Sequence, residues 1–539
     1  VGIAQAAATI GRVFTRDVLG DVTSRGRELV DRGLRALLDG GLLDEEGDDV
    51  YSFRHALIRD VAYELQPREQ RATMHGRVGD ALRARRKRGA DVSWGAIATH
   101  FHAAGRLAAA IESYAAAADD SRERGSMTSG IEQLGTAIDL IGELGPDRAA
   151  PAREVDLRLK RGFLCVSTAG NADPRAEADY QRCLELVRAE GDGLQLVATL
   201  VALWGYHIAR GDLAEADGLL DDILATRVTD DPVLLAENRT ARGMVRFFQG
   251  WFIASEEQLR LAIDAVPDTV RDTRPPSPWQ FPNDPIAFMQ VQYGVALWQR
   301  GDLVGFEEHL RRARRRIEQL PRPYGPFSLA HALTYRGWVL CEIGDFDGAE
   351  ACTSELLAIA EQYGFDFWTL AGTTADAINR ARALLASGTV DASLLLEQAE
   401  RLAGTTMLAN MIHSRLLLPY NLTAQAELLA EVGDHDQALD LFDEAMVVAD
   451  ETGSRYYSAE TLRLRARTRR ALGHPLAIDD LHRAIELASR QGSIPFELRA
   501  RLDLAELGSR SPRLEDLLAV AAFAAASGVP SPDLSVPGA

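Results

Sequence analysis

Hydrophobic residues recur at helical spacing along most of the chain, and strand-like runs are scarce. Thr15 and Ser24 are each followed by helix-forming sequence, as N-caps should be, and the second of these two helices is expected to end at Gly40 and Gly41. Its apolar face holds Leu29, Val30, Leu34, Leu37 and Leu38. Alanine and leucine dominate the remainder, so the pattern predicts a mainly α-helical protein.

Two short apolar runs, at 42–43 and 50–53, flank the acidic turn DEEGDD. This arrangement predicts a two-stranded hairpin. Helices followed by such a wing are typical of a winged helix, which we expect over residues 1–68. Residues 69–125 are expected to hold linking helices and the start of a helical array.

Winged helices often bind DNA, so the charges of this region matter. The helix that would enter the groove carries Arg25, Arg27, Arg32 and Arg35, but acidic residues are interspersed with them. The wing carries Asp44, Glu45, Glu46, Asp48 and Asp49. Because contacts to phosphate supply much of the affinity for DNA, these carboxylates argue against a nucleic-acid partner.

A glycine that closes one helix recurs throughout the second part of the chain. It occurs at 105, 211, 250, 301, 344, 388, 433 and 473. From 211 onward the spacing is roughly 40 to 50 residues, a period typical of stacked helical hairpins. Gly125 and Gly170 are candidates for further turns, and the register between 105 and 211 stays open.

Small residues keep a fixed distance from these glycines. Seven positions earlier, all but one of the eight residues are Ala or Gly. Small side chains there allow two helices to approach closely. The pattern resembles tetratricopeptide repeats with lengthened helices. We therefore expect an all-α protein, with a tetratricopeptide-like superhelix of helical hairpins over 126–539 preceded by the small winged-helix domain.

Composition narrows the functional classes. With 539 residues the chain is too long for one compact core, and its net charge of −20 argues against anionic lipid or nucleic acid as a general partner. The four cysteines lack CxxC spacing and are expected to be buried and reduced in a cytoplasmic protein. No apolar run is long enough to cross a membrane. Neither lysine lies in a P-loop motif, and no catalytic motif is recognisable, so we expect no enzyme activity and no cofactor in this chain.

Two segments near the start, LRALLDGGLL and YSFRHALIRDVAYEL, carry a family resemblance. They resemble the winged-helix segment that follows the nucleotide-binding core in bacterial signal-transduction ATPases of the AAA/STAND type. The resemblance implies that His55 senses the phosphates of a nucleotide, with Arg54 and Arg59 as helpers. A helix N-terminus and an imidazole can both bind phosphate. The alternative is that Phe53, Leu57 and Val61 are core and His55 only caps the helix, and this alternative is favoured for the chain alone.

Further segments extend the resemblance. PYGPFSLAHAL, EQYGFDFWTLAG, RQGSIPFELRARLDLAEL and FAAASGVPSPDL resemble the back half of bacterial proteins that join a class III adenylate or guanylate cyclase domain, an ATPase core, a winged helix and tetratricopeptide repeats. The resemblance implies that this chain begins inside a longer protein, in which ATP or ADP would be the cofactor of an attached or partner nucleotide-binding domain.

Several residues are candidates for binding a ligand or partner. The proline-rich stretch 267–285 offers Trp279 and Phe281 as anchors, although an insertion packed on the outside would look the same. Arg311 and Arg315 share one helix stripe that could grip a carboxylate, although a solvated face paired with acids is favoured. Aromatic residues on the first helices of hairpins would line the concave side or fill the core. They are Tyr293, Trp298 and Tyr335, together with Trp204 and Trp338.

The sequence thus predicts a non-catalytic sensor or regulatory region. It would bind a protein, peptide or small ligand in a helical-repeat groove and control a nucleotide-binding signalling module. A stand-alone scaffold for protein assembly and a winged-helix transcriptional regulator are the alternatives.

Overall fold

The computed structural model describes residues 2–23, 25–47, 49–145, 150–190, 193–226, 232–266, 281–388, 391–507, 513, 515 and 517–518. The chain divides into two compact units, Val1–Arg161 and Gly162–Ala539. We call these the first unit and the second unit and describe each by itself. The boundaries at 68 and 125 expected from the sequence stay predictions.

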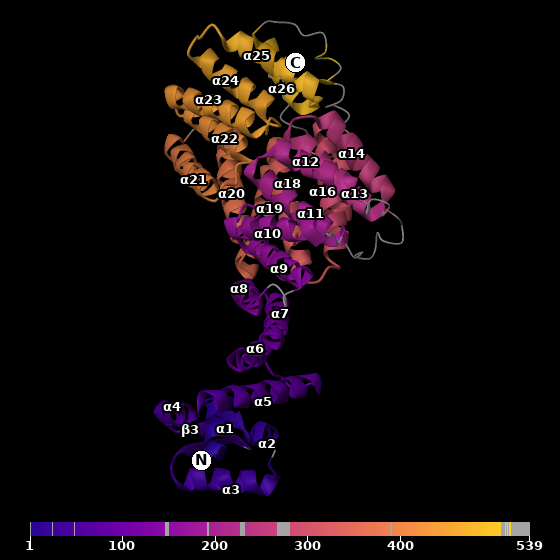
Figure 1. Ribbon diagram of the computed structural model, residues 1–539. Helices are drawn as coiled ribbons and strands as arrows, with labels where there is room; N and C mark the ends of the chain where they lie inside the picture. Colours follow the sequence, from indigo (N-terminus) through magenta and orange to yellow (C-terminus); the bar gives the residue numbers. More distant parts are fainter. Residues whose placement is uncertain are drawn as a thin grey trace. The chain divides into compact units, whose positions relative to one another are not determined.

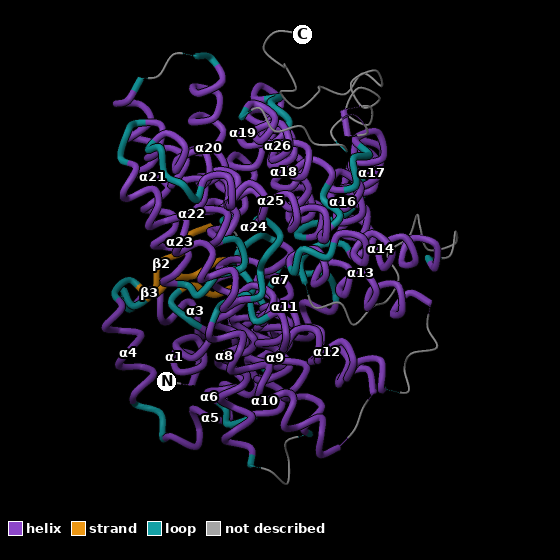
Figure 2. Tube along the Cα trace, turned by 90° about the horizontal axis from the view of Figure 1, so that it is seen from above, coloured by secondary structure: helices purple, strands orange, loops and turns teal. Residues whose placement is uncertain are grey.

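The first unit combines helices with a small antiparallel sheet in the order β1-β3-β2. The hairpin expected around the acidic turn is confirmed, because Leu43 pairs with Phe53 and Asp44 with Ser52. A third strand, missed by the sequence pattern, pairs Val13 with Ser52. The strands are orange in Figure 2, and those described all lie in this unit. The elements are α1 (Gly2–Ile10), β1 (Val13–Thr15), α2 (Arg16–Thr23), α3 (Arg27–Asp39), β2 (Leu43–Gly47), β3 (Val50–Phe53), α4 (Ala56–Glu64), α5 (Arg68–Lys87), α6 (Trp94–Ala103), α7 (Leu107–Glu123) and α8 (Met127–Leu144).

The core of the first unit corrects two expectations about which side chains are buried. Val30, Leu34 and Phe53 are in the core as expected, but Leu29 on α3 is 50% exposed. On α4, Leu57 is 72% exposed and Val61 is 50% exposed, so neither belongs to the core. The helix α4 contacts α1 and β3, and the side chains that pack against the core are those of Ile58, Ala62 and Tyr63, which are only partly buried. Leu57 and Val61 lie on the exposed side of the helix.

The second unit is a run of antiparallel helical hairpins of tetratricopeptide type, in which consecutive helices pack side by side (Figure 1). We call the earlier helix of each hairpin its first helix. The hairpins and the final helix are α9 (Pro151–Ala169, which crosses the boundary between the units) with α10 (Pro174–Glu190), α11 (Gly193–Arg210) with α12 (Leu213–Ala225), α13 (Pro232–Phe248) with α14 (Phe252–Ala265), α16 (Pro285–Gln299) with α17 (Leu303–Ile317), α18 (Tyr324–Glu342) with α19 (Phe346–Tyr363), α20 (Asp366–Ala386) with α21 (Ala392–Met411), α22 (Leu418–Glu431) with α23 (His435–Thr452), α24 (Ser458–Ala471) with α25 (Ala477–Gln491), and α26 (Ile494–Glu506).

The predicted turn glycines are confirmed. All eight lie between two helices and have positive φ, for example 81° at Gly211 and 91° at Gly433. A left-handed backbone is accessible to glycine at little cost, which explains why this residue closes each first helix. Gly125 and Gly170 also lie between helices with positive φ.

Small residues allow the two helices of a hairpin to touch. A Cβ built on Gly243 would lie 2.6 Å from Cγ of Leu259, and one on Gly294 would lie 2.7 Å from Cδ2 of Leu310. Both glycines stand seven residues before a turn glycine, where the sequence predicted close approach. The close packing of α13 with α14 and of α16 with α17 therefore depends on glycine, which has no side chain, at positions 243 and 294.

The hairpins wind into successive turns of a superhelix. The end of an early first helix therefore lies next to the segment that precedes a first helix in the following turn. The first helices follow in the order α11, α13, α16, α18, α20, α22, so α22 is the fifth after α11. Just before α22, the backbone N–H of Arg415 donates to the carbonyl of Ala209 at 3.0 Å. The N–H of Tyr456, before α24, donates to the carbonyl of Phe248 on α13 at 3.0 Å. Ser493 Oγ, before α26, donates to Gln299 Oε1 on α16 at 2.6 Å.

A buried ionic cluster also connects these two turns of the superhelix. The Glu342 carboxylate at the end of α18 is fully buried and accepts from Arg382 Nη1 at 2.7 Å. It also accepts from the Tyr457 hydroxyl and from Arg499 Nη1, both at 2.9 Å. Arg499 Nη1 in turn contacts Glu460 Oε1 at 2.7 Å. The cluster thereby joins α18 to α20, α24 and α26.

Candidate functional site

A cavity of about 220 Å³ lies at the inner side of the hairpins in the second unit. Its wall is built mainly from first helices, above all α18 and α20, with contributions from α11, α13, α16 and α22. Ala209, Ser414, Leu416 and Tyr456, which lie at the junctions between turns, also line it. The return of the superhelix therefore brings residues of two turns into the wall of one cavity, which we call the central cavity.

The wall of the central cavity is largely aromatic. On α18, residues 327, 331, 335 and 338 are spaced at i, i+4, i+8 and i+11, which places them in one stripe. The ring of Trp368 stands 5.3 Å from that of Phe327, and the ring of Trp338 stands 5.9 Å from that of Tyr456. Edge-to-face arrangements of this kind, here at interplanar angles of 70° and 80°, are favourable between rings.

The polar groups of the wall are uncharged at neutral pH. Among the described lining residues there is no Asp, Glu, Lys or Arg. Burial lowers the pKa of His331 to about 3, so its imidazole is neutral, and Gln292 Nε2 lies 3.3 Å from its Nε2. Burial also raises the pKa of Tyr335 to about 12. The central cavity is therefore suited to an uncharged ligand.

Two residues that line the central cavity, Trp338 and Trp368, carry a buried indole N–H group. Nε1 of Trp338 and Nε1 of Trp368 are both buried, and neither has a hydrogen-bond partner among the described residues. The Trp368 side chain is only 6% exposed. A buried donor without an acceptor is unfavourable, and because protein atoms cover both Nε1 atoms, neither opens onto the central cavity.

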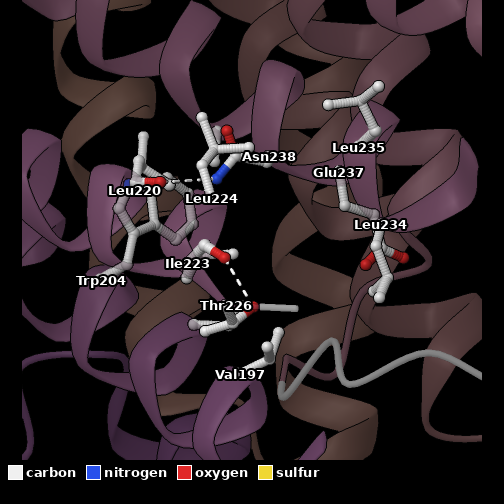
Figure 3. A pocket seen from close by; sticks show the side chains of 12 residues that line it. Val197, Trp204, Leu220, Ile223, Leu224, Thr226, Leu234, Leu235, Glu237 and Asn238 are labelled. Carbon is white, nitrogen blue, oxygen red and sulfur yellow. Dashed lines mark hydrogen bonds between the residues drawn. The ribbon is translucent and has the colours of Figure 1, made fainter. Parts of the chain in front are cut away.

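A second, much smaller hollow adjoins Trp204 between α11, α12 and α13 (Figure 3). It has a volume of about 20 Å³, enough for roughly one water molecule. Asn238 Nδ2 beside it donates to the carbonyl of Leu220 at 3.1 Å. This hollow is a gap in helix packing, whereas the central cavity on the inner side of Trp204 has room for a ligand.

The structure separates the predicted aromatic residues into two groups. Phe281 and Tyr335 line the central cavity. Trp298 is 2% exposed and packs on Trp338 at 5.1 Å, while Tyr293 packs on His309 at 4.7 Å. Neither Trp298 nor Tyr293 lines the central cavity. Trp279 lies outside the described residues, so its predicted anchoring role stays a prediction.

The predicted basic stripe on α17 is exposed, and one of its two arginines contacts an acidic side chain on the same helix. Arg311 contacts Glu308 at 2.6 Å, and its side chain is 59% exposed. Arg315 is exposed one turn further along the same helix. Neither arginine lines the central cavity.

In the first unit, the predicted phosphate-sensing residues gather at the start of α4. His55 is exposed and is the N-cap of α4, although its side chain makes no capping hydrogen bond. Arg54 is paired with Asp44 at 2.7 Å, and Arg59 with Asp60 at 3.0 Å. The role of the three residues in binding nucleotide stays a prediction.

Sequence reasoning missed the residues that contribute most to the central cavity. Phe327, His331, Phe367 and Trp368 lie in the segments PYGPFSLAHAL and EQYGFDFWTLAG, which carry the family resemblance. The aromatic stripe at 327, 331, 335 and 338 was readable from the sequence as helical spacing. It could not be assigned to a cavity because aromatic stripes more often pack in a core.

The described part of the chain holds no group of three or more metal-binding side chains. None of the described helices combines the length and apolar character needed to span a bilayer.

Comparison with known proteins gives distant matches. No family model matches the chain. An uncharacterized protein of Rhizobium meliloti (strain 1021) is 24% identical over 515 residues, which cover 94% of this chain and 48% of that protein. The chain thus spans about half the length of this curated relative.

Several solved structures are similar at 13% sequence identity. A Rap protein complexed with Competence and Sporulation Factor matches 70% of this chain and 99% of its own length, with a TM-score of 0.43. The Rap conjugation gene regulator of plasmid pLS20 in complex with the Phr* peptide matches 61% and 95%, with a TM-score of 0.41. A STAND protein with a tetratricopeptide repeat sensor from Pyrococcus horikoshii matches 89% and 61%, with a TM-score of 0.35.

Proposed function

We propose that this chain is a non-catalytic sensor or regulatory region. A ligand would bind in the central cavity of the second unit, and its presence would control an attached or partner nucleotide-binding module. The observation that carries the proposal is the central cavity itself, which is about 220 Å³ in volume, rich in aromatic side chains, and without a charged side chain among its described lining residues. Cavities of this composition, with a few convergent polar groups, are typical of ligand sites.

The position of the central cavity supports a regulatory role. Its wall joins early hairpins to late ones, because Ala209 and Phe248 are hydrogen-bonded to the segments that precede α22 and α24. A ligand that contacts both turns would stabilise the closed superhelix relative to a more open one. A ligand can shift such an equilibrium only by its difference in affinity for the two states, and here that difference arises from contacts made in the closed state alone.

An exposed apolar stripe on α4 supports docking of the nucleotide-binding module on the first unit. Leu57, Val61 and Leu65 are 72%, 50% and 68% exposed and are spaced at i, i+4 and i+8. Such a stripe is typical of a helix that buries one face against a partner. His55 immediately precedes α4, so docking there would place its imidazole at the interface, as the resemblance to bacterial ATPases implies. ATP or ADP would then belong to the module, and His55, Arg54 and Arg59 would contact its phosphates.

The test uses the longest natural protein that contains this chain. If its reading frame encodes a P-loop, nucleotide exchange and hydrolysis are measured for the natural sequence and for two variants. Ala375→Phe fills the central cavity, which Ala375 lines, and His55→Ala removes the imidazole. Ala351→Phe places the same bulk on the exposed face of α19 and serves as the control.

Both variants should alter basal exchange by about threefold or more, since an effect of 0.7 kcal/mol or more corresponds to roughly that ratio. The control should leave exchange unchanged. Unchanged exchange in both variants would refute control of nucleotide state. If the reading frame lacks a P-loop, the same variants are compared for capture of a separate nucleotide-binding protein.

A stand-alone scaffold is the second candidate, because α21 exposes an apolar face. Met407, Leu408 and Met411 on this helix are 60%, 47% and 67% exposed. Exposed patches of this kind favour contact with another protein. A pull-down in which Met407→Asp and Met411→Asp together remove one defined partner, with nucleotide turnover unaffected, would favour the scaffold over the sensor.

A further inference from the structure

We infer that the ligand of the central cavity is a small, uncharged, ring-containing molecule of roughly two fused rings. This inference rests on the proposed function, because it names the class of ligand for the same site. It selects one of the three ligand classes left open by the sequence and sets aside peptides and charged metabolites.

The size of the central cavity limits the ligand. A cavity of roughly 150 Å³ is known to hold benzene, so one of about 220 Å³ holds roughly two rings. A five-residue peptide in extended form spans roughly 17 Å and brings backbone N–H and C=O groups that all need partners when buried. Several polar side chains of the wall are already bonded within the protein. Thr334 Oγ1 and Thr374 Oγ1 each donate to a backbone carbonyl, and Asn379 Nδ2 donates to Thr353 Oγ1.

The charge of the central cavity limits the ligand further. No described side chain that lines it is charged at neutral pH, and the arginines of the neighbouring cluster are occupied. Arg382, for example, is committed to Glu342 and to the Tyr457 hydroxyl. A carboxylate or phosphate would therefore lose its hydration without gaining a counter-ion, which is strongly unfavourable.

The aromatic rings of the wall define the shape of the ligand. The rings of Phe327, Tyr335 and Tyr456 supply faces and edges on which an aromatic ligand can stack. Protein atoms cover the indole Nε1 atoms of Trp338 and Trp368, so these donors do not select among neutral aromatic ligands.

Three naphthalene compounds test the inference on the full chain by calorimetry at pH 7. They share the rings and differ in one substituent: naphthalene has none, 2-acetylnaphthalene carries a neutral one, and 2-naphthoate carries an anionic one. We expect naphthalene and 2-acetylnaphthalene each to bind about tenfold or more tightly than 2-naphthoate, given the unfavourable burial of an unpaired charge.

Substitutions then locate the binding site. Ala375→Phe should abolish binding of naphthalene and of 2-acetylnaphthalene, and Ala371→Leu provides a milder filling of the same wall should the larger residue disturb folding. Ala351→Phe on α19 should leave binding unchanged.

The results separate this inference from the proposed function. Equal or tighter binding of 2-naphthoate, or binding that ignores both filling variants, would overturn the neutral-ligand inference. The same holds if none of the three compounds binds while a pool of short peptides binds in competition with the filling variants, yet the sensor proposal would then survive. Binding as expected, with nucleotide exchange in the longer protein insensitive to Ala375→Phe, would leave the ligand class standing and remove the proposed control.

Discussion

Replacement of Glu342 by glutamine should loosen the closure of the superhelix. The carboxylate is fully buried and accepts three hydrogen bonds, from Arg382, Tyr457 and Arg499. Glutamine has nearly the same shape but no charge. Arg382 would keep only the Glu427 carboxylate at 3.3 Å as its acidic partner, whereas Arg499 would keep Glu460. The variant therefore leaves buried positive charge poorly compensated.

The expected effect follows from these contacts. Hydrogen bonds to charged groups contribute about 1.5–3 kcal/mol each, but the amide oxygen retains part of this set. Removal of one partner from a buried ion pair costs about 3–5 kcal/mol, and we expect Glu342→Gln to lower the local free energy of unfolding by that amount. The matched control is Glu355→Gln on α19, whose bond to Arg314 joins side chains that are 38% and 48% exposed. An exposed pair contributes about 0–1 kcal/mol.

The assay is native-state hydrogen exchange, because an array of this size does not unfold in one step. Amides of α26 are the reporters, since Arg499 lies on this helix and contacts Glu342 directly. A loss of about 3–5 kcal/mol corresponds to exchange roughly a hundred to a few thousand times faster in α26. If α26 exchanged no faster in Glu342→Gln than in Glu355→Gln, the cluster would not be what holds the two turns together.

Four further predictions concern other parts of the chain. Burial alone would raise the pKa of Glu460, but the adjacent guanidinium groups lower it to about 2. The stabilising contribution of this carboxylate should thus be complete above pH 4.5 and vanish as the pH falls toward 2. Urea unfolding at successive pH values would reveal this loss. Burial lowers the pKa of His100 to about 4, so the first unit should lose stability as the pH falls from 6.5 toward 4, and His100→Gln should flatten that dependence in thermal unfolding. Gly243→Ala should lower stability by about 1–3 kcal/mol through overpacking, whereas Gly404→Ala, with no atom within 4 Å of the new Cβ, should raise it by about 0.5–1 kcal/mol; native-state hydrogen exchange of α13 and α21 measures the two effects. Burial raises the pKa of Cys341 to about 11, so iodoacetamide should modify it in the folded chain far more slowly than in urea, and equal rates by mass spectrometry would contradict its burial.

Local patterns were enough to predict the hairpins. A turn glycine such as Gly301 and a small residue such as Gly294 act on neighbouring helices, so their meaning is contained in a short stretch of sequence. The β-hairpin around the acidic turn was predictable for the same reason. The strand Val13–Thr15 was missed because its partner lies far along the chain and its length gives no periodicity.

The central cavity could not be predicted because it depends on contacts between distant hairpins. Tyr456 reaches the wall only because its segment is bonded to Phe248, which lies about two hundred residues earlier in the sequence. In the same way, nothing near Leu57 or Val61 indicates that α4 packs with its apolar stripe outward. Spacing identifies a helical face, but it does not say whether that face meets core, cavity or solvent.

The bond between each early first helix and its counterpart five hairpins later limits how this protein can change in length. Open solenoids tolerate duplication or deletion of a single repeat, because each repeat contacts only its neighbours. Here, an extra hairpin inserted after α14 would shift every later helix by one place, so that the segment before α22 would no longer reach Ala209. Viable relatives should therefore differ in their loops or at the outer ends of the array, and they should preserve the number of hairpins between the bonded partners.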